Sequence, residues 1–392
     1  MTEPDTFLWS GITSGVKKSG KPDLGLAYSA YPATTAGVFT KNSLSAAPVR
    51  IDRERLQDKR TFRGLVVNSG VANAATGEEG RQRCRSVINE TAKTLGLESD
   101  EVLAASTGHI GKPLPVDTIT GALPDSVDAL EESSDNFADA IMTTDSTRKT
   151  VQRDVTDLNA RMRGIAKGAG MIRPDMATML AFVFFDHPVD PDWWQRTLER
   201  ACSESFNQIT VDGEMSTNDT VLAFGARRPD REPIDGSHDA AATVRESLTA
   251  ICESLARSIV LDGEGATQLI EITVEGAPDA EAAETVADST ANSNLLKTAI
   301  YGGDPNWGRI YSAIGATTLD INEESLSISM NGYTLFEGPG DASIAPPGLH
   351  EELGDSDPVT IRIDLGNGSS TARRLTCDLT EEYIRINSDY EP

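Results

Sequence analysis

The chain has 392 residues, of which 38% are apolar and only 5% aromatic, and its 35 basic and 61 acidic side chains give a formal net charge of −26. Such an acidic balance argues against nucleic acids and anionic membrane surfaces as partners. The length predicts two or three domains, or one large domain with an appendage. Lysine is scarce beside arginine, at 10 against 25 residues, which fits either a high-salt cytoplasm or a host with GC-rich codons.

Cysteine and histidine are few and scattered. The four cysteines stand at positions 84, 202, 252 and 377 without a CxxC pair, and no HExxH motif occurs. Widely spaced thiols predict neither a zinc site nor a disulfide framework, and they suit a reducing cytosol. The first residues carry acids and lack the apolar segment of a signal peptide. We therefore expect a cytoplasmic location and no bound metal.

The predicted elements alternate between strand and helix, which favours an α/β or α+β fold. The apolar run 176–185 predicts a buried strand, and the polar, proline-containing stretch 227–236 predicts a surface loop. Apolar residues then recur at helical spacing over 240–260, which predicts an amphipathic helix. The alternation over 270–274 predicts another strand.

The last third of the chain is predicted to be rich in strands. The acidic, alanine-rich stretch 276–289 is either a linker or an exposed helix, and β-type patterns dominate from about residue 317. Two alternating segments, 361–365 and 375–379, flank the glycine turn at 366–368 and predict a hairpin with a long loop. The segment 383–386 also resembles a strand, with Asn387 at its end.

The most informative window runs from Lys167 to Asp186. A glycine-rich loop and a proline lead to Ala177-Thr178, and a buried strand follows at once. Thr178 Oγ could attack the carbonyl of Ala177, and hydrolysis of the resulting ester would leave Thr178 with a free α-amine beside its hydroxyl, as in N-terminal nucleophiles. From the residues alone, a buried β-branched residue at the start of a strand remains the alternative. No glycine cluster of the chain matches GxxxxGK[ST], GxGxxG or GxSxG.

This window resembles the self-cleaving segment of the ornithine acetyltransferase family, also called glutamate N-acetyltransferases, of the cyclic arginine pathway. The resemblance covers essentially the whole chain in the family's order. Further matching stretches are 15–20, 32–42, 106–111, 206–219, 304–309 and 383–390.

The resemblance implies roles for individual residues. Thr178 would be the nucleophile, exposed by cleavage after Ala177, and Thr107 with Gly108 would form the oxyanion hole, whose fixed donors stabilise the tetrahedral intermediate. The resemblance also implies that Thr144 and Lys167 contact the substrate and that Glu264 is an active-site acid. It implies that Asn387, near the C-terminus, binds the substrate.

The resemblance also implies the reaction. N2-acetylornithine would acylate Thr178 and ornithine would leave; glutamate would then accept the acetyl group and become N-acetylglutamate. Both substrates are α-amino acids of similar side-chain length, so one binding site can serve both steps. No cofactor is implied, because the Thr178 ester carries the acetyl group. Acetyl-CoA is the open alternative as a second donor, which would make the enzyme bifunctional.

The expected fold is a layered α/β fold shared with self-cleaving aminopeptidases, plus a smaller β-rich C-terminal domain. We expect a catalytic α/β domain over 1–285 and a smaller α+β domain over 286–392 that completes the site. After cleavage, the α chain (1–177) and the β chain (178–392) would stay together as a heterotetramer or larger assembly.

The sequence departs from the family's pattern at three positions. Asp175 stands where the family usually has Asn, Val71 follows Gly70 where Asn is usual, and the last residue, Pro392, lacks the family's hydroxyl. Two rival functions stay open. One is a peptidase or amidase of the same fold with water as the acceptor; the other is an uncleaved amino-acid-binding protein.

Overall fold

The computed structural model describes residues 6–173, 179–340 and 345–389, and these divide into two compact units. The first contains residues 1–207 and 214–259, and the second contains 208–213 and 260–390. The second unit thus begins earlier than the predicted boundary between 285 and 286. The reason is that the strand predicted over 270–274 lies inside the second sheet, where its partners hold it.

The first unit is built on one large mixed sheet. Its strands pair in the order β4-β3-β2-β8-β7-β6-β5, with β1 added against β2. The strands are β1 (Phe7–Ile12), β2 (Leu24–Phe39), β3 (Thr61–Asn68), β4 (Val102–Ser106), β5 (Lys149–Val155), β6 (Ala160–Lys167), β7 (Leu180–Phe185) and β8 (Thr220–Ala226). The helices are α1 (Ala47–Asp58), α2 (Gly77–Leu95), α3 (Val116–Asp128), α4 (Asp135–Ile141), α5 (Pro191–Ser203) and α6 (Ala241–Leu261).

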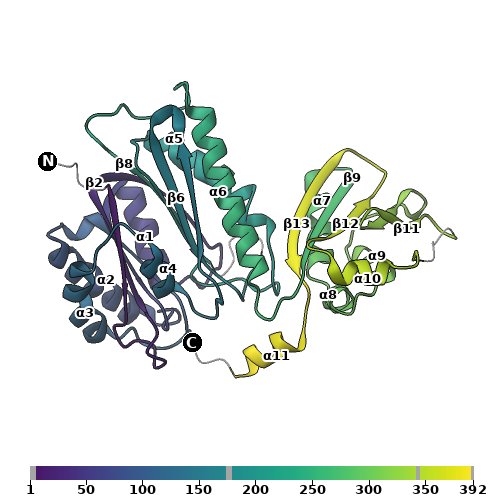
Figure 1. Ribbon diagram of the computed structural model, residues 1–392, viewed down its shortest axis with the longest axis horizontal. Helices are drawn as coiled ribbons and strands as arrows, with labels where there is room; N and C mark the ends of the chain where they lie inside the picture. Colours follow the sequence, from purple (N-terminus) through teal and green to yellow (C-terminus); the bar gives the residue numbers. More distant parts are fainter. Residues whose placement is uncertain (1–5, 174–178, 341–344, 390–392) are drawn as a thin grey trace. The chain divides into compact units, whose positions relative to one another are not determined.

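The two halves of this sheet form separate layers. One buried cluster joins Leu65 of β3 and Leu103 of β4 to Phe182 of β7 and Phe224 of β8, so the sheet halves face each other across a common core. On the outer face of the β3–β4 half lie α2 and α3, whose apolar residues form a second cluster. On the other half, α5 and α6 run along the strands (Figure 1).

The predicted strand and helix of this unit are confirmed. β7 is buried over its whole length, as expected of the apolar run 176–185, and it begins at Leu180. α6 covers the helix predicted over 240–260, and Val244, Leu248 and Ile251 of its predicted apolar face are fully buried. Repeated burial at helical spacing explains why this element could be recognised from the sequence.

The second unit contains a smaller sheet with the strand order β11-β10-β12-β9-β13. Its strands are β9 (Leu269–Ala277), β10 (Ser327–Met330), β11 (Tyr333–Glu337), β12 (Val359–Asp364) and β13 (Ser370–Cys377). Its helices are α7 (Ala280–Ala291), α8 (Asn294–Tyr301), α9 (Trp307–Gly315), α10 (Leu349–Asp355) and α11 (Glu381–Ser388). A layered α/β fold with a smaller unit around a second sheet confirms the predicted fold class.

Three local predictions in this unit need correction. β12 and β13 do not form a hairpin, because β9 lies between them, parallel to β12 and antiparallel to β13. The stretch 276–289 is neither a linker nor an exposed helix: α7 buries Ala283 and Val286 in the core. The segment 383–386 belongs to α11, so Asn387 lies on a helix. Alternation over only four residues cannot distinguish the period of a strand from that of a helix. The capping residue Thr380 and the acidic residues of the first turn are the helix signals in this segment.

Candidate active site

Lys167 brings three segments of the first unit together. It is the last residue of β6 and pairs with Leu180, the first residue of β7, so it lies beside the strand that begins two residues after Thr178. Its Nζ donates to Thr143 Oγ1 at 2.8 Å and to Thr107 Oγ1 at 3.3 Å. The structure therefore brings the predicted residues Lys167 and Thr107 into contact. Ala177 and Thr178 lie outside the described residues.

Thr107 and Gly108 directly follow β4. The Thr107 N–H donates to the carbonyl oxygen of Asn68 at 3.0 Å, which leaves the Thr107 hydroxyl and the Gly108 N–H as the candidate donors to an oxyanion. Gly108 has φ +123°, and a Cβ there would lie 2.3 Å from the carbonyl carbon of Gly70. Only glycine fits this close approach, so the conformation of the predicted oxyanion segment depends on Gly108.

Asp145 organises the charges around Lys167. Its fully buried carboxylate pairs with Lys149 Nζ at 2.8 Å and lies 4.0 Å from Lys167 Nζ. It also accepts from the backbone N–H groups of Thr143 at 2.9 Å and Gly168 at 2.6 Å. Burial opposes ionisation, but Lys167 and Lys149 together hold the pKa of the Asp145 carboxyl well below its ordinary value. Asp145 thus ties the segment carrying Thr143 to the end of β6.

A third buried lysine, Lys17, lies near this cluster. Its Nζ donates to the carbonyl oxygens of Met142 at 2.7 Å and Pro22 at 2.9 Å. Burial lowers the pKa of Lys17 to about 8, and the charge of Lys167 adds to the shift, while Asp23 and Asp145 oppose it. The three ammonium groups face two buried carboxylates, those of Asp23 and Asp145, so one positive charge is in excess. A substrate carboxylate has the charge and the acceptor atoms to bind there.

Several members of this cluster were not predicted from the sequence. Thr143 contacts Lys167, whereas the role of its half-buried neighbour Thr144 as a substrate contact stays a prediction. Lys17, Asp145 and Lys149 were not singled out either. Lys17 lies in the matching stretch 15–20, and the local signal for Asp145 and Lys149 was their separation of four residues, a spacing common in ion pairs.

In the second unit the structure brings Glu264 and Asn387 together. Asn387 Nδ2 donates to Glu264 Oε2 at 2.8 Å and to the carbonyl oxygen of Tyr383 at 3.0 Å. Both of these contacts use the amide nitrogen, so Asn387 Oδ1 is the atom best placed to accept from a substrate ammonium group.

The loop carrying Glu264 fits closely against the start of α11. Gly265 has φ +71°, and a Cβ there would lie 2.5 Å from the backbone nitrogen of Tyr383. Thr380 Oγ1, whose residue caps α11, donates to the carbonyl oxygen of Gly265 at 2.7 Å. The Glu264–Asn387 pair is thus held by backbone contacts on both sides.

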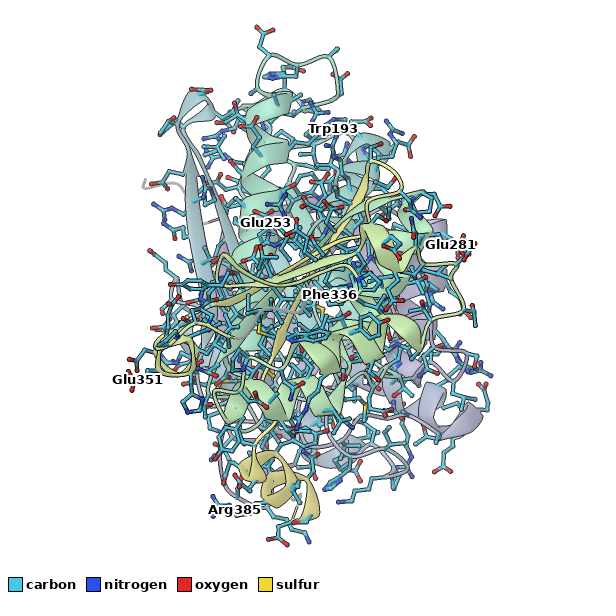
Figure 2. The ribbon with its side chains drawn as sticks, turned by 90° about the vertical axis from the view of Figure 1, so that its right-hand side faces the viewer. Trp193, Glu253, Glu281, Phe336, Glu351 and Arg385 are labelled. Carbon is cyan, nitrogen blue, oxygen red and sulfur yellow. The ribbon has the colours of Figure 1, made fainter. Side chains whose placement is uncertain are left out.

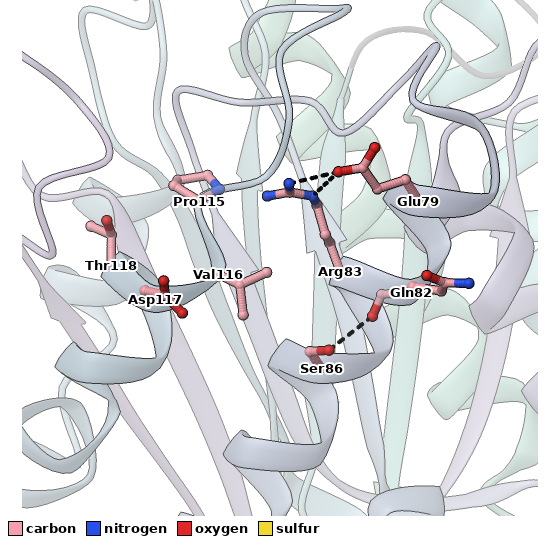
Figure 3. A pocket seen from close by; sticks show the side chains of 8 residues that line it. All are labelled: Glu79, Gln82, Arg83, Ser86, Pro115, Val116, Asp117 and Thr118. Carbon is pink, nitrogen blue, oxygen red and sulfur yellow. Dashed lines mark hydrogen bonds and ion pairs between the residues drawn. The ribbon is translucent and has the colours of Figure 1, made fainter.

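A separate pocket of about 520 Å³ opens between α2 and the beginning of α3 (Figure 3). None of the predicted site residues lines it. Arg83, the cation among its lining residues, already pairs with Glu79 at 2.6 Å and donates to the carbonyl oxygen of Leu114 at 3.0 Å. This pocket is therefore not the predicted active site.

The described residues contain neither a metal cluster nor a membrane-spanning helix. Within 6–173, 179–340 and 345–389, no group of three or more His, Cys, Asp or Glu side chains could hold a metal ion. Over the same ranges, every helix is too short or too polar to cross a membrane.

Comparison with known proteins identifies the family. The model of the ArgJ family matches residues 8–392. The arginine biosynthesis bifunctional protein ArgJ of Thermosynechococcus vestitus is 44% identical, over 97% of this chain and 95% of its own length. The protein of the same name from Nitratidesulfovibrio vulgaris is 42% identical, over 99% and 98%. The crystal structure of a Bacillus halodurans protein of this name is similar with a TM-score of 0.50 and 38% identity, over 53% of this chain and 98% of that one. These matches confirm the predicted resemblance, and the chain belongs to the ArgJ family.

Proposed function

We propose that this enzyme transfers the acetyl group of N2-acetylornithine to glutamate through an acetyl ester on Thr178. The observation that carries the proposal is the position of the Lys167 ammonium group, which contacts Thr107 and Thr143 beside the strand that begins two residues after Thr178. A buried cation and hydroxyl donors next to a nucleophile provide the charges that acyl transfer requires.

Self-cleavage between Ala177 and Thr178 would generate the nucleophile. The new α-amine of Thr178 accepts the proton of its own hydroxyl as Oγ attacks the acetyl carbonyl of N2-acetylornithine. The tetrahedral intermediate then breaks its C–N bond, the proton passes to the departing amine, and ornithine leaves. The amine of glutamate attacks the ester, Thr178 Oγ departs and recovers a proton, and N-acetylglutamate is released.

The described residues supply binding and orientation. The Thr107 hydroxyl and the Gly108 N–H would donate to the oxyanion, and Lys167, oriented by Thr143 and Asp145, would bind a substrate carboxylate. Glu264 and Asn387 Oδ1 would accept from a substrate ammonium group, and Thr144 would contribute a further substrate contact.

The transfer requires no cofactor, because the acetyl group is carried on Thr178. Acetyl-CoA is proposed as a second donor, in keeping with the word bifunctional in the names of the relatives. We also propose that the enzyme works in the cytoplasm as a heterotetramer or larger assembly of its α and β chains. The four cysteines, all buried and free, suit a reducing compartment.

Self-cleavage is supported by the length of the Bacillus halodurans chain. Since 98% of that chain corresponds to only 53% of this one, it is about half as long. The test is to compare wild type with Thr178→Ala by mass spectrometry. Wild type should give chains of 177 residues and of the remaining 215, the larger beginning Thr-Met-Leu-Ala. Thr178→Ala should stay whole and inactive; cleavage at this bond in the variant would contradict the mechanism.

The substrate assignment is tested separately. With N2-acetylornithine alone, the larger chain should gain one acetyl group, and glutamate should discharge it as N-acetylglutamate. Incubation of acetyl-CoA with glutamate then decides whether acetyl-CoA is a donor. Rapid release of acetate with no dependence on glutamate would favour the peptidase or amidase instead.

A further inference from the structure

Two consecutive buried residues, Asn218 and Asp219, connect segments that are far apart in the sequence. They immediately precede β8, which begins at Thr220. Asn218 Nδ2 donates to the carbonyl oxygens of Ser106 at 2.8 Å and Ala72 at 2.7 Å. Ser106 is the residue before Thr107, so Asn218 holds the backbone from which the predicted oxyanion segment begins.

The side chain of Asp219 holds a different segment. Its Oδ1 accepts from the Met179 N–H at 3.1 Å, and the Thr220 N–H donates to the carbonyl oxygen of Met179 at 3.2 Å. Both backbone polar groups of Met179 are therefore bound at the start of β8. Met179 directly follows Thr178, so this contact restrains the peptide unit on the C-terminal side of the proposed nucleophile.

Asp219 is an unusual choice for a structural acceptor. It is fully buried, and the hydroxyl groups of Thr40 and Ser216 lie near its carboxyl. Burial raises the pKa of Asp219 well above its ordinary value, although the Met179 N–H, the Thr40 and Ser216 hydroxyls and the charge of Lys167 oppose the shift. A carboxyl can accept from the Met179 N–H through Oδ1 whether or not it carries a proton.

We propose that Asn218 and Asp219 form a clamp that fixes the position of the nucleophile segment relative to the oxyanion segment. The clamp rests on the proposed function, and both members are positioning residues. Because they are adjacent in the chain, the Ser106 carbonyl and the Met179 N–H are set by one short piece of backbone. A displacement of about 1 Å at a reacting centre can lower the rate about a hundredfold, so loss of either contact should lower kcat far more than it changes KM.

The test compares Asp219→Ala, Asp219→Asn and Asn218→Ala with wild type. Acetyl transfer from N2-acetylornithine to glutamate is measured per mole of chain that carries a free Thr178 amine, so that slow self-cleavage is not mistaken for slow turnover. We expect Asp219→Ala and Asn218→Ala to lower kcat about a hundredfold with little change in KM. Asp219→Asn should restore most of kcat, because the amide Oδ1 can accept from the same N–H.

Asp52 provides the matched control. It is also a buried carboxyl with a raised pKa that accepts from one backbone N–H, that of Ala104 at 3.2 Å. Asp52→Ala should lower the thermal midpoint without a comparable loss of kcat. This comparison separates positioning from a general loss of stability.

The outcomes are distinguishable. If wild type transfers no acetyl group, the proposed function fails. If wild type is active and Asp219→Ala and Asn218→Ala lose only stability, as Asp52→Ala does, the clamp is refuted. Should Asp219→Ala not fold, Asn218→Ala decides alone, since it removes the other half of the clamp and predicts the same loss of kcat.

Discussion

The buried charge cluster around Asp145 makes a quantitative prediction. Asp145→Asn keeps the size of the side chain but removes the negative charge that lies 2.8 Å from Lys149 Nζ and 4.0 Å from Lys167 Nζ. All three side chains are at most 3% exposed. Removing the charge of one partner in a buried ion pair leaves the other charge uncompensated, which lowers the free energy of unfolding by about 3–5 kcal/mol. For a unit of this size the thermal midpoint should fall by roughly 6–20 °C.

A nearby exposed pair serves as the control. Asp139 pairs with Arg148, but the Arg148 side chain is 45% exposed, so Asp139→Asn should cost about 1 kcal/mol or less. Both variants are best made in a Thr178→Ala background, in which the chain should remain whole and unfolding involves one molecule. The free energy of unfolding is then measured in urea with circular dichroism.

The pH dependence of this cost is also predicted. The pKa of Asp145 is lower in the folded state than in the unfolded chain, so its carboxylate stabilises the fold above the unfolded pKa of about 3.9. That contribution is lost progressively as the pH falls below this value towards the folded pKa. The free-energy cost of Asp145→Asn should therefore be constant near neutral pH and shrink in acid. Equal costs for Asp145→Asn and Asp139→Asn at neutral pH would refute the reasoning.

Three further predictions concern kinetics, substrate binding and salt. Double-reciprocal plots of rate against one substrate, at several concentrations of the other, should be parallel, because the acetyl ester separates the two half-reactions. Intersecting lines would count against an acetyl-enzyme intermediate. Asn387→Ala should lower kcat/KM for both substrates about tenfold or more, since a hydrogen bond to a charged group contributes about 1.5–3 kcal/mol. Arg385→Ala, on the same helix but exposed, should leave kcat/KM unchanged. Pro392→Thr should leave kcat/KM unchanged or raise it mildly. The thermal midpoint should rise between low and molar KCl, because carboxylates that lie close together within a unit repel one another less when the screening length falls from ~10 Å at 0.1 M to ~3 Å at 1 M. Glu253, Glu281 and Glu351 are examples of exposed carboxylates (Figure 2). A flat response would leave only the codon-based explanation of the composition.

Those elements of the fold that carry a clear local sequence pattern were predictable. The buried strand β7 was predicted from a continuous apolar run, and the helix α6 from apolar residues that recur at helical spacing. The position of β9 between β12 and β13 was not predictable, because a strand pattern reports which face is buried and not which strand lies beside it.

The residues of the candidate site also divide into those that the sequence predicted and those that it did not. Lys167, Thr107 and Gly108 were predicted because they lie in motifs that resemble a known family. Asn218 and Asp219 also lie in a matching stretch, 206–219, but the contact that gives Asn218 its role joins it to Ser106, 112 positions away. Asp145 likewise accepts from Gly168, 23 positions away, and no local pattern encodes these contacts. Only the folded chain reveals such contacts.

The strand order of the first unit has a consequence for assembly. β7 and β8 come after the proposed cut, yet they lie between β6 and β2, which come before it. Two complete ladders, β6–β7 and β2–β8, would thus join the severed chains. In a chain cut there, the two fragments would not come apart without unpairing both ladders. Once denatured, the mature enzyme would have to refold by a bimolecular reaction, so its recovery should fall on dilution while that of uncut Thr178→Ala should not.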